Sequence, residues 1–268
     1  MNWIEALILG IIQGLTEFLP VSSSGHLELG KELLGVETTE NLTFTVLVHG
    51  ATVLSTIVIF RKEITNLLSG LFRFEWNEET KYISKIGLSM IPIAIVGLFF
   101  KDSVESIFES SNILLLVGLM LLITATFLTF AYYKKSGNKD LTYFHSFIIG
   151  IAQTIAILPG ISRSGATIAT GLLIGNRKNE IAKFSFLMVL IPILGENLLS
   201  ILKFDTSLQT SSQNPEIIVM IIGFVAAFVS GLAACKWMIN IVKNGKLIYF
   251  AIYCAIVAAI AISANLLG

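Results

Sequence analysis

Charged residues are scarce in this sequence. Only 13% of its 268 residues are Asp, Glu, Lys or Arg, whereas 54% are hydrophobic, and soluble domains carry roughly 25% charged residues. The mean hydropathy is +0.82. This balance excludes an ordinary soluble domain, and the formal net charge of zero gives no field that would favour nucleic acid. The composition predicts an all-α polytopic membrane protein, a single membrane domain over residues 1–268.

Cysteines are few, and the start of the sequence does not resemble a leader. Only Cys235 and Cys254 occur, far apart within apolar runs, so they form no metal-binding spacing. The first apolar run has no basic segment before it and continues into polar residues. We therefore expect no cleavable signal peptide.

Long apolar runs, by contrast, are frequent. Two shorter apolar stretches, 3–19 and 143–158, end at Pro20 and at Pro159, and a serine-rich turn and a second short helical stretch follow each. This pattern predicts two re-entrant helical hairpins, because irregular backbone at membrane depth is tolerated only where protein or a water-filled cavity surrounds it. Six further runs are long enough to cross a hydrocarbon core of roughly 30 Å: residues 43–60, 83–100, 113–133, 184–202, 217–235 and 247–267.

The basic residues are distributed unevenly over the connecting segments. If residues 61–82 are cytoplasmic, only Lys31, Lys101 and Lys203 lie on the outer side, and Arg163 alone remains within the membrane. Under the positive-inside rule this asymmetry predicts that both termini lie outside, that the first hairpin enters from outside and that the second enters from the cytoplasm. The cytoplasmic side receives Arg61, Lys62, Arg73, Lys81, Lys85, Lys134, Lys135, Lys139, Arg177, Lys178, Lys183, Lys236, Lys243 and Lys246.

The two hairpins also resemble each other in sequence. "GIIQGLTEFLPVSSSGHL" starts at Gly10 and "GIAQTIAILPGISRSGATI" starts at Gly150. A shift of 140 residues aligns these two stretches, Gln13 with Gln153 among them. It also divides the chain into repeats 1–140 and 141–268. Each repeat holds one hairpin and three spans, and because three is odd the second is inserted upside down. Such an inverted-topology repeat, with broken helices meeting near the midplane, is shared by many transporters.

Both hairpin tips carry a serine before a glycine and a helix. Serine is a strong N-cap, and the first N–H groups of a helix attract anions. Arg163 adds a planar, doubly donating charge that suits phosphate oxygens, and an idle arginine at this depth would be costly. We therefore expect an anionic, diphosphate-like group to bind at the two tips. The candidate binding residues are Ser22, Ser24, Gly25, Gly160, Ser162, Ser164 and Thr167.

The first tip also supplies groups that can move a proton. Glu17, Ser23 and His26 are the candidate catalytic residues, together with Arg163. Ser23 and His26 could form a nucleophile–base pair, or His26 could attack or activate water while Ser23 binds phosphate. Glu17 could orient His26, act as a base or bind a metal ion with Gln13, one helical turn earlier. Glu17 could also simply pair with Arg163 and hold the two halves together.

Two further polar positions inside predicted spans receive no assigned role. His49 lies in "VLVHGAT" and Glu196 lies in "LGENLL". Each could equally well serve function or hydrogen bonding within the helix bundle.

The motifs "EFLPVSSSGH" and "PGISRSGATI" together resemble those of the undecaprenyl-diphosphate phosphatases, the bacitracin-resistance family of bacterial inner membranes. The resemblance extends over the whole chain. It implies hydrolysis of undecaprenyl diphosphate to the monophosphate carrier of cell-wall synthesis, with dependence on Mg²⁺ or Ca²⁺. Many members carry Glu at the position of Gln13, so a metal shared by two carboxylates is not implied here. Many also carry Gln at the position of His49, so the resemblance implies no role for His49.

These observations favour an enzyme that acts on a polyprenyl diphosphate lipid, with an outward-facing site. The alternative is a transporter or flippase for a phosphorylated lipid or anion, which would use the same inverted-repeat site. The sequence also permits a homo-oligomer, since small residues in 223–234 allow close helix packing.

Overall fold

The computed structural model describes residues 1–35, 42–108, 112–135, 137–202 and 217–267, and these are almost entirely helical. The expected all-α fold is confirmed. Apart from one isolated bridge between Lys139 and Asn176, the described residues form no strand pairing. The helices are α1 (Trp3–Phe18), α2 (Ser23–Leu34), α3 (Leu42–Ile59), α4 (Arg61–Leu71), α5 (Glu78–Phe99), α6 (Lys101–Phe108), α7 (Ile113–Tyr133), α8 (Tyr143–Ile155), α9 (Arg163–Leu173), α10 (Lys178–Leu202), α11 (Ile217–Asn244) and α12 (Ile248–Leu267).

Four of these helices are long and apolar enough to cross a membrane: α5, α7, α11 and α12. A fifth span results if α3 and α4, which meet at a bend of 76°, count as one. The expected span 184–202 lies within α10. The described residues therefore contain several helices of membrane length, and the arrangement of six spans stays a prediction.

Several helices extend beyond the apolar runs seen in the sequence. α5 begins at Glu78 because the Asn77 side chain caps it, accepting a hydrogen bond of 2.8 Å from Thr80 N. α10 starts at Lys178 and α11 continues to Asn244. Hydropathy marks only the apolar part of a helix, whereas the backbone hydrogen bonds continue through its polar ends.

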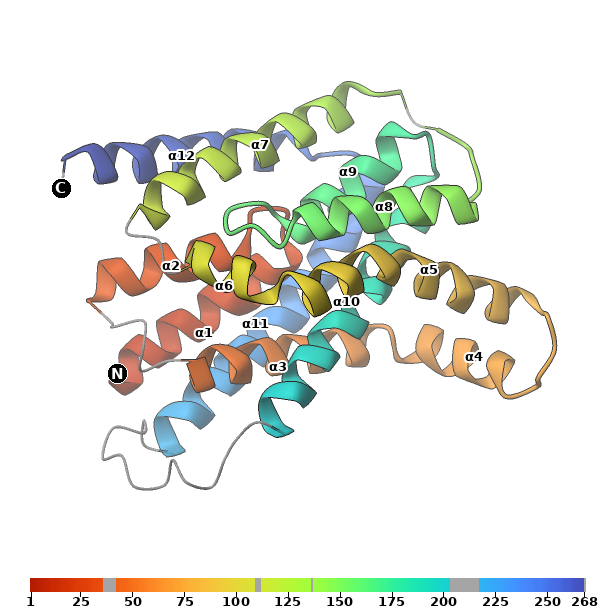
Figure 1. Cartoon of the computed structure of the whole chain (residues 1–268), viewed down its shortest axis with the longest axis horizontal. Coiled ribbons are helices and arrows are strands. Elements are labelled where there is room, and N and C mark those ends of the chain that lie inside the picture. Colours follow the sequence, from red (N-terminus) through yellow and green to blue (C-terminus); the bar gives the residue numbers. More distant parts are fainter. Residues whose placement is uncertain (36–41, 109–111, 136, 203–216, 268) are drawn as a thin grey trace.

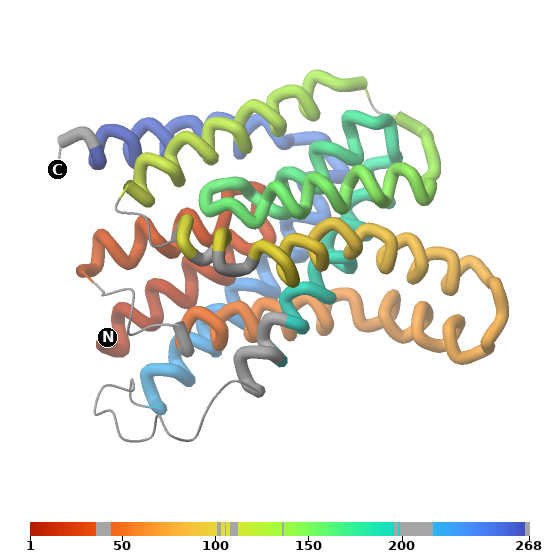
Figure 2. Tube along the Cα trace, viewed as in Figure 1, coloured from red at the N-terminus to blue at the C-terminus, as the bar shows by residue number. Residues whose placement is uncertain are grey.

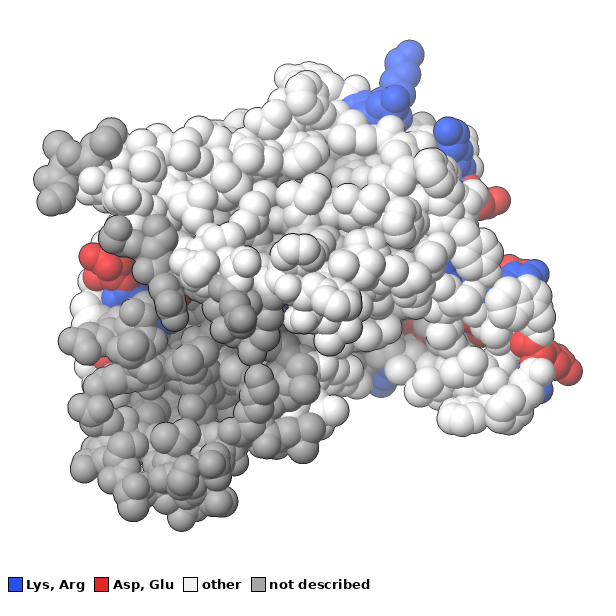
Figure 3. Space-filling model, in the orientation of Figure 1, with Lys and Arg blue, Asp and Glu red and all other residues white. Residues whose placement is uncertain are grey.

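Figures 1 and 2 show how the two predicted hairpins are arranged. α1 and α2 enter and leave from the end of the molecule that carries both termini, whereas α8 and α9 do so from the opposite end. Their turns meet in the middle of the long axis. In the space-filling view most charged side chains lie toward the two ends of this axis, with a largely uncharged band between them (Figure 3). This distribution is the one expected if the long axis crosses the bilayer.

The two halves interlock. α1 packs along α11, and α8 packs along α5, so the first helix of each hairpin lies against a long helix of the other half. Glycine permits both crossings: a Cβ atom at Gly10 would meet the carbonyl of Gly223, and one at Gly150 would meet that of Ser89. Close backbone approach through small residues is typical of membrane helices.

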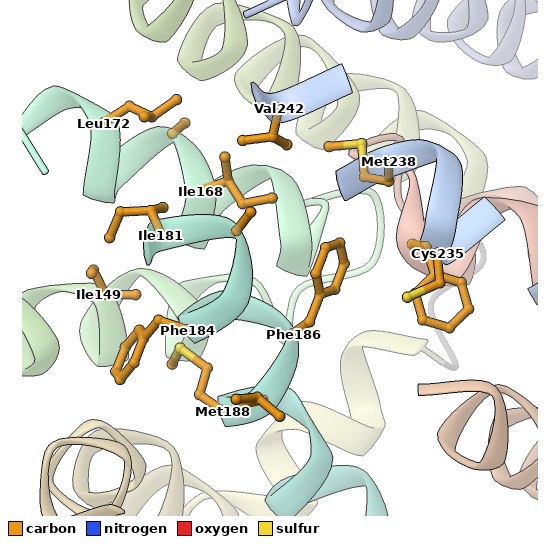
Figure 4. Close-up of a cluster of buried hydrophobic side chains, with 14 of the residues drawn as sticks. Ile149, Ile168, Leu172, Ile181, Phe184, Phe186, Met188, Cys235, Met238 and Val242 are labelled. Carbon is orange, nitrogen blue, oxygen red and sulfur yellow. The ribbon is translucent and has the colours of Figure 1, made fainter. Parts of the chain in front are cut away.

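The largest hydrophobic cluster of the described residues is formed by α8 to α11 together with flanking helices. Ile168 of α9 is fully buried in it, with Phe184 and Met188 of α10 and Met238 of α11 (Figure 4). This packing fixes the orientation of α9, which begins at Arg163. The arginine is therefore presented by a firmly held helix.

Candidate functional site

The first tip is a strained turn that ends in a capped helix. Ser22 has a positive φ of 70°, a conformation that residues other than glycine rarely adopt. Its Oγ atom accepts a hydrogen bond of 3.3 Å from the backbone N–H of Gly25 and lies 3.3 Å from Ser24 Oγ. Backbone strain of this kind concentrates at functional sites.

The second tip repeats this arrangement. Ser162 Oγ accepts from Gly165 N at 3.0 Å and lies 3.3 Å from Ser164 Oγ. Gly160, with φ of 98°, makes the turn. Thr167, predicted to bind substrate, is fully buried, and its hydroxyl lies 2.5 Å from the Ser185 hydroxyl. This contact joins α9 to α10.

The two tips touch each other. Ser164 Oγ donates a hydrogen bond of 3.2 Å to the carbonyl of Leu19. A Cβ atom at Gly25 would lie 3.4 Å from the Cα atom of Gly160. The N-termini of α2 and α9, two anion-attracting helix ends, are thus brought to one place, as the sequence predicted.

Glu17 lies at this junction and is the most highly connected side chain of the candidate site. Its Oε2 atom accepts hydrogen bonds from Ser23 Oγ at 2.6 Å and from Gln13 Nε2 at 3.0 Å. His49 Nε2 lies 3.9 Å from the same oxygen, and Arg163 Nη2 lies 3.7 Å from Oε1. The carboxylate therefore faces Ser23 of its own hairpin and Arg163 of the second.

A small cavity of about 20 Å³ opens beside Glu17. Glu17, Arg163 and Ser164 line one part of it, and apolar side chains from one face of α10 line another. The lining therefore combines charged and apolar side chains, the two kinds of contact that an amphipathic ligand makes. Besides Glu17, Arg163 and Ser164, the cavity is lined by Phe18, Thr52, Val53 and Thr56 and, from α10, by Phe186, Val189, Leu190 and Ile193.

His26 is placed apart from this network. Its Nδ1 atom lies 2.9 Å from the carbonyl oxygen of Ser22, and its Nε2 atom lies 2.8 Å from the hydroxyl of Tyr253. Among the hydrogen bonds of the described residues, none joins Ser23 to His26, and the Ser23 hydroxyl is directed to Glu17 instead. The proposed Ser23–His26 pair is therefore not present as a direct contact, and the role of each residue stays a prediction.

Sequence reasoning missed two neighbours of the predicted residues. Tyr253 lies in no motif, and nothing in the sequence places α12 beside α2. His49 was left without a role, yet the structure puts its Nε2 atom beside Glu17, and no motif in the sequence indicated this contact. The side chain of Glu196 lies outside the part of the chain that the structure describes.

Gln13 and Glu17 are predicted to bind a divalent cation, and they fit one only if substrate phosphates complete its ligands. The Oε1 atom of Gln13 is buried and has no hydrogen-bond partner among the described residues, and the carboxylate of Glu17 is adjacent. Oxygen ligands of this kind suit Mg²⁺ or Ca²⁺, and Mg²⁺ is often held by one or two carboxylates plus substrate phosphates. The described residues contain no group of three or more His, Cys, Asp or Glu side chains that could hold a metal ion.

Comparison with known proteins gives one consistent result. Residues 6–260 match the family model described as bacitracin resistance protein BacA. The chain is 59% identical to the undecaprenyl-diphosphatase of Parabacteroides distasonis over 268 residues, covering 100% of both chains. It is 60% identical to that of Bacteroides fragilis and 52% identical to that of Christiangramia forsetii, covering 98% of each chain in both cases.

Proposed function

Since the chain belongs to the bacitracin resistance protein BacA family, we propose that it is an undecaprenyl-diphosphatase. It hydrolyses undecaprenyl diphosphate to undecaprenyl phosphate and inorganic phosphate. This reaction recycles the lipid carrier of bacterial cell-wall synthesis and lowers sensitivity to bacitracin. The relatives named undecaprenyl-diphosphatase match over nearly the full length of both chains, which supports the transfer of this activity.

The observation that carries the proposal is the position of Glu17 between Ser23 and Arg163. A hydroxyl that already donates to a carboxylate can lose its proton as it attacks phosphorus. The Arg163 guanidinium lies beside the other oxygen of the Glu17 carboxylate. From there it can bind the diphosphate bidentately. A carrier has no need of a hydroxyl–carboxylate pair beside its anion site.

In the proposed reaction, Ser23 Oγ forms a bond to the terminal phosphorus. The bond from that phosphorus to the bridging oxygen breaks, and its electron pair leaves with undecaprenyl phosphate. The Ser23 proton passes to Glu17 Oε2. Water then hydrolyses the phosphoserine, and phosphate is released.

The remaining tip residues stabilise the anion. Arg163 and the N–H groups at the starts of α2 and α9 surround the position where charge develops, and catalysis of phosphoryl transfer consists largely of such positioning and charge neutralisation. As an alternative to accepting the proton, Glu17 would hold a Mg²⁺ or Ca²⁺ ion together with Gln13, and that ion would neutralise charge on the phosphate oxygens. The apolar side chains of α10 would receive the first part of the prenyl tail.

Phosphate release tests this function directly. The full-length protein in detergent, with Mg²⁺ and a short-chain prenyl diphosphate, should release inorganic phosphate without any membrane gradient. Arg163→Ala is the matched negative control. Binding of the lipid without release by the wild-type protein would indicate a carrier instead.

A rapid-quench experiment with labelled diphosphate distinguishes the possible nucleophiles. We expect an acid-stable phosphoserine that disappears in Ser23→Ala. Acid-labile phosphohistidine would assign the attack to His26, and the absence of any covalent species would assign it to water.

We further propose the membrane arrangement predicted from the sequence: six spans and two re-entrant hairpins, formed by inverted repeats 1–140 and 141–268 within one domain of the bacterial cytoplasmic membrane. The shared end of the two termini and the opposite entry of the two hairpins support it (Figure 1). The basic residues favour both termini, and the site, facing outward. A Ser24→Cys variant lacking Cys235 and Cys254 should react with an impermeant thiol reagent from the outer side. Labelling from the cytoplasmic side alone would reverse this orientation.

A further inference from the structure

We propose that Tyr253 is a positioning residue for His26 in the diphosphate hydrolysis proposed above, on which this inference rests. Tyr253 lies in α12, and no motif includes it. Its hydroxyl lies 2.8 Å from His26 Nε2, and the two rings are nearly parallel, with centroids 5.5 Å apart and planes 12° apart.

The direction of each hydrogen bond follows from the partners. The Ser22 carbonyl can only accept, so Nδ1 of His26 carries the proton in the bond of 2.9 Å. Nε2 of a neutral imidazole is then an acceptor, and Tyr253 donates its O–H to it. Two partners on opposite sides of the ring therefore hold a single tautomer and a single ring orientation.

The same contacts reach the strained turn at the first tip. The Ser22 carbonyl also accepts from the backbone N–H of His26 at 3.1 Å, and Ser22 is the residue with positive φ. Tyr253 thus acts through His26 on the turn that presents Ser23 to Glu17.

A second contact from α12 supports this coupling. Cys254, the next residue, is buried and its Sγ atom lies 3.6 Å from the carbonyl oxygen of Pro20. α12 in turn packs along α7, so Tyr253 is presented from a helix that is itself held. Two consecutive residues of α12 therefore contact the first tip.

Histidine tautomers can be read directly, because the chain has only three histidines. With ¹⁵N-labelled histidine in the full-length protein, His26 should show a protonated Nδ1 and an unprotonated Nε2, assigned by loss of its signals in His26→Gln. Tyr253→Phe keeps the ring and removes the donor. We expect it to shift the His26 Nε2 signal, to lower kcat about tenfold and to change KM little, as for loss of one hydrogen bond that holds the turn presenting Ser23.

Tyr249→Phe is the matched control, because Tyr249 lies in the same helix and is 66% exposed. It should leave the His26 signals and kcat unchanged. Tyr253→Phe added to His26→Gln should lower the residual turnover no further, since the tyrosine acts through the histidine.

The inference is overturned if Tyr253→Phe leaves the His26 signals unchanged, or if it slows His26→Gln by a further tenfold. It is also overturned if kcat keeps its wild-type value. Failure of the proposed function itself is separate: the wild-type protein would then release no phosphate, whatever the tautomer of His26.

Discussion

Arg163 Nη2 lies 3.7 Å from Glu17 Oε1, so one ion pair joins the first hairpin to the second. The two residues are 146 positions apart in the sequence, and the Glu17 side chain is only 7% exposed. A carboxylate that is so buried needs a charged or hydrogen-bonding partner. The pair therefore holds the two tips together and presents the guanidinium at the cavity.

Replacement of Arg163 separates these two roles. Arg163→Ala should lower kcat/KM for a prenyl diphosphate by about 100-fold or more, because it removes charge-assisted bonds to phosphate. It should also lower the unfolding midpoint in detergent, because Glu17 loses its ionic partner. Arg163→Lys should recover stability better than activity, since a point charge does not replace the bidentate fork.

In the double variant Glu17→Gln with Arg163→Met, stability should recover while activity stays lost. Near-normal hydrolysis by Arg163→Ala would contradict the diphosphate clamp.

Ser23 and Ser24 offer a matched comparison between neighbouring hydroxyls. Ser23 Oγ donates to Glu17, whereas Ser24 Oγ lies beside Ser22 Oγ. Ser23→Ala should reduce phosphate release by about 1,000-fold, the scale of losing an activated nucleophile. Ser24→Ala should reduce it less than tenfold. Equal effects of the two substitutions in a steady-state assay would remove the special role of Ser23.

His49 should matter through its contact with Glu17. Its Nδ1 atom lies 2.8 Å from the Thr45 carbonyl oxygen, which directs Nε2 toward the carboxylate. His49→Leu should lower kcat about tenfold, because Glu17 then faces an apolar side chain. His49→Gln, which keeps a polar group there, should retain most activity. A fully active His49→Leu enzyme would show that this contact is dispensable.

The crossing of α8 over α5 should tolerate no added side chain. Gly150→Ala would place a methyl group against the backbone of Ser89, and overpacking of this kind costs roughly 1 to 3 kcal/mol. The unfolding midpoint in detergent should fall accordingly. Gly87→Ala in α5 is the control, because a Cβ atom there meets nothing within 4 Å. If both variants unfold at the wild-type temperature, the helices are farther apart than described.

Local signals in the sequence were sufficient for much of the fold. The scarcity of charge and the apolar runs predicted an all-helical membrane protein, and the Pro, Ser and Gly residues predicted both tips. These features depend on neighbours within a few positions, such as the cap of Gly165 by Ser162, and a single sequence displays them. The six-span arrangement stays a prediction, and a bend such as that between α3 and α4 depends on packing that a single sequence does not display.

The contacts of the site were beyond the sequence. The motifs named Glu17, Ser23, His26 and Arg163, but they did not show that Ser23 would face Glu17 or that His26 would face Tyr253. By itself the sequence determined which reactive groups are present and that two helix ends carry them, because composition and capping are local properties. Only the tertiary structure decided which of these groups touch, because that depends on how α2 packs against α1 and α12.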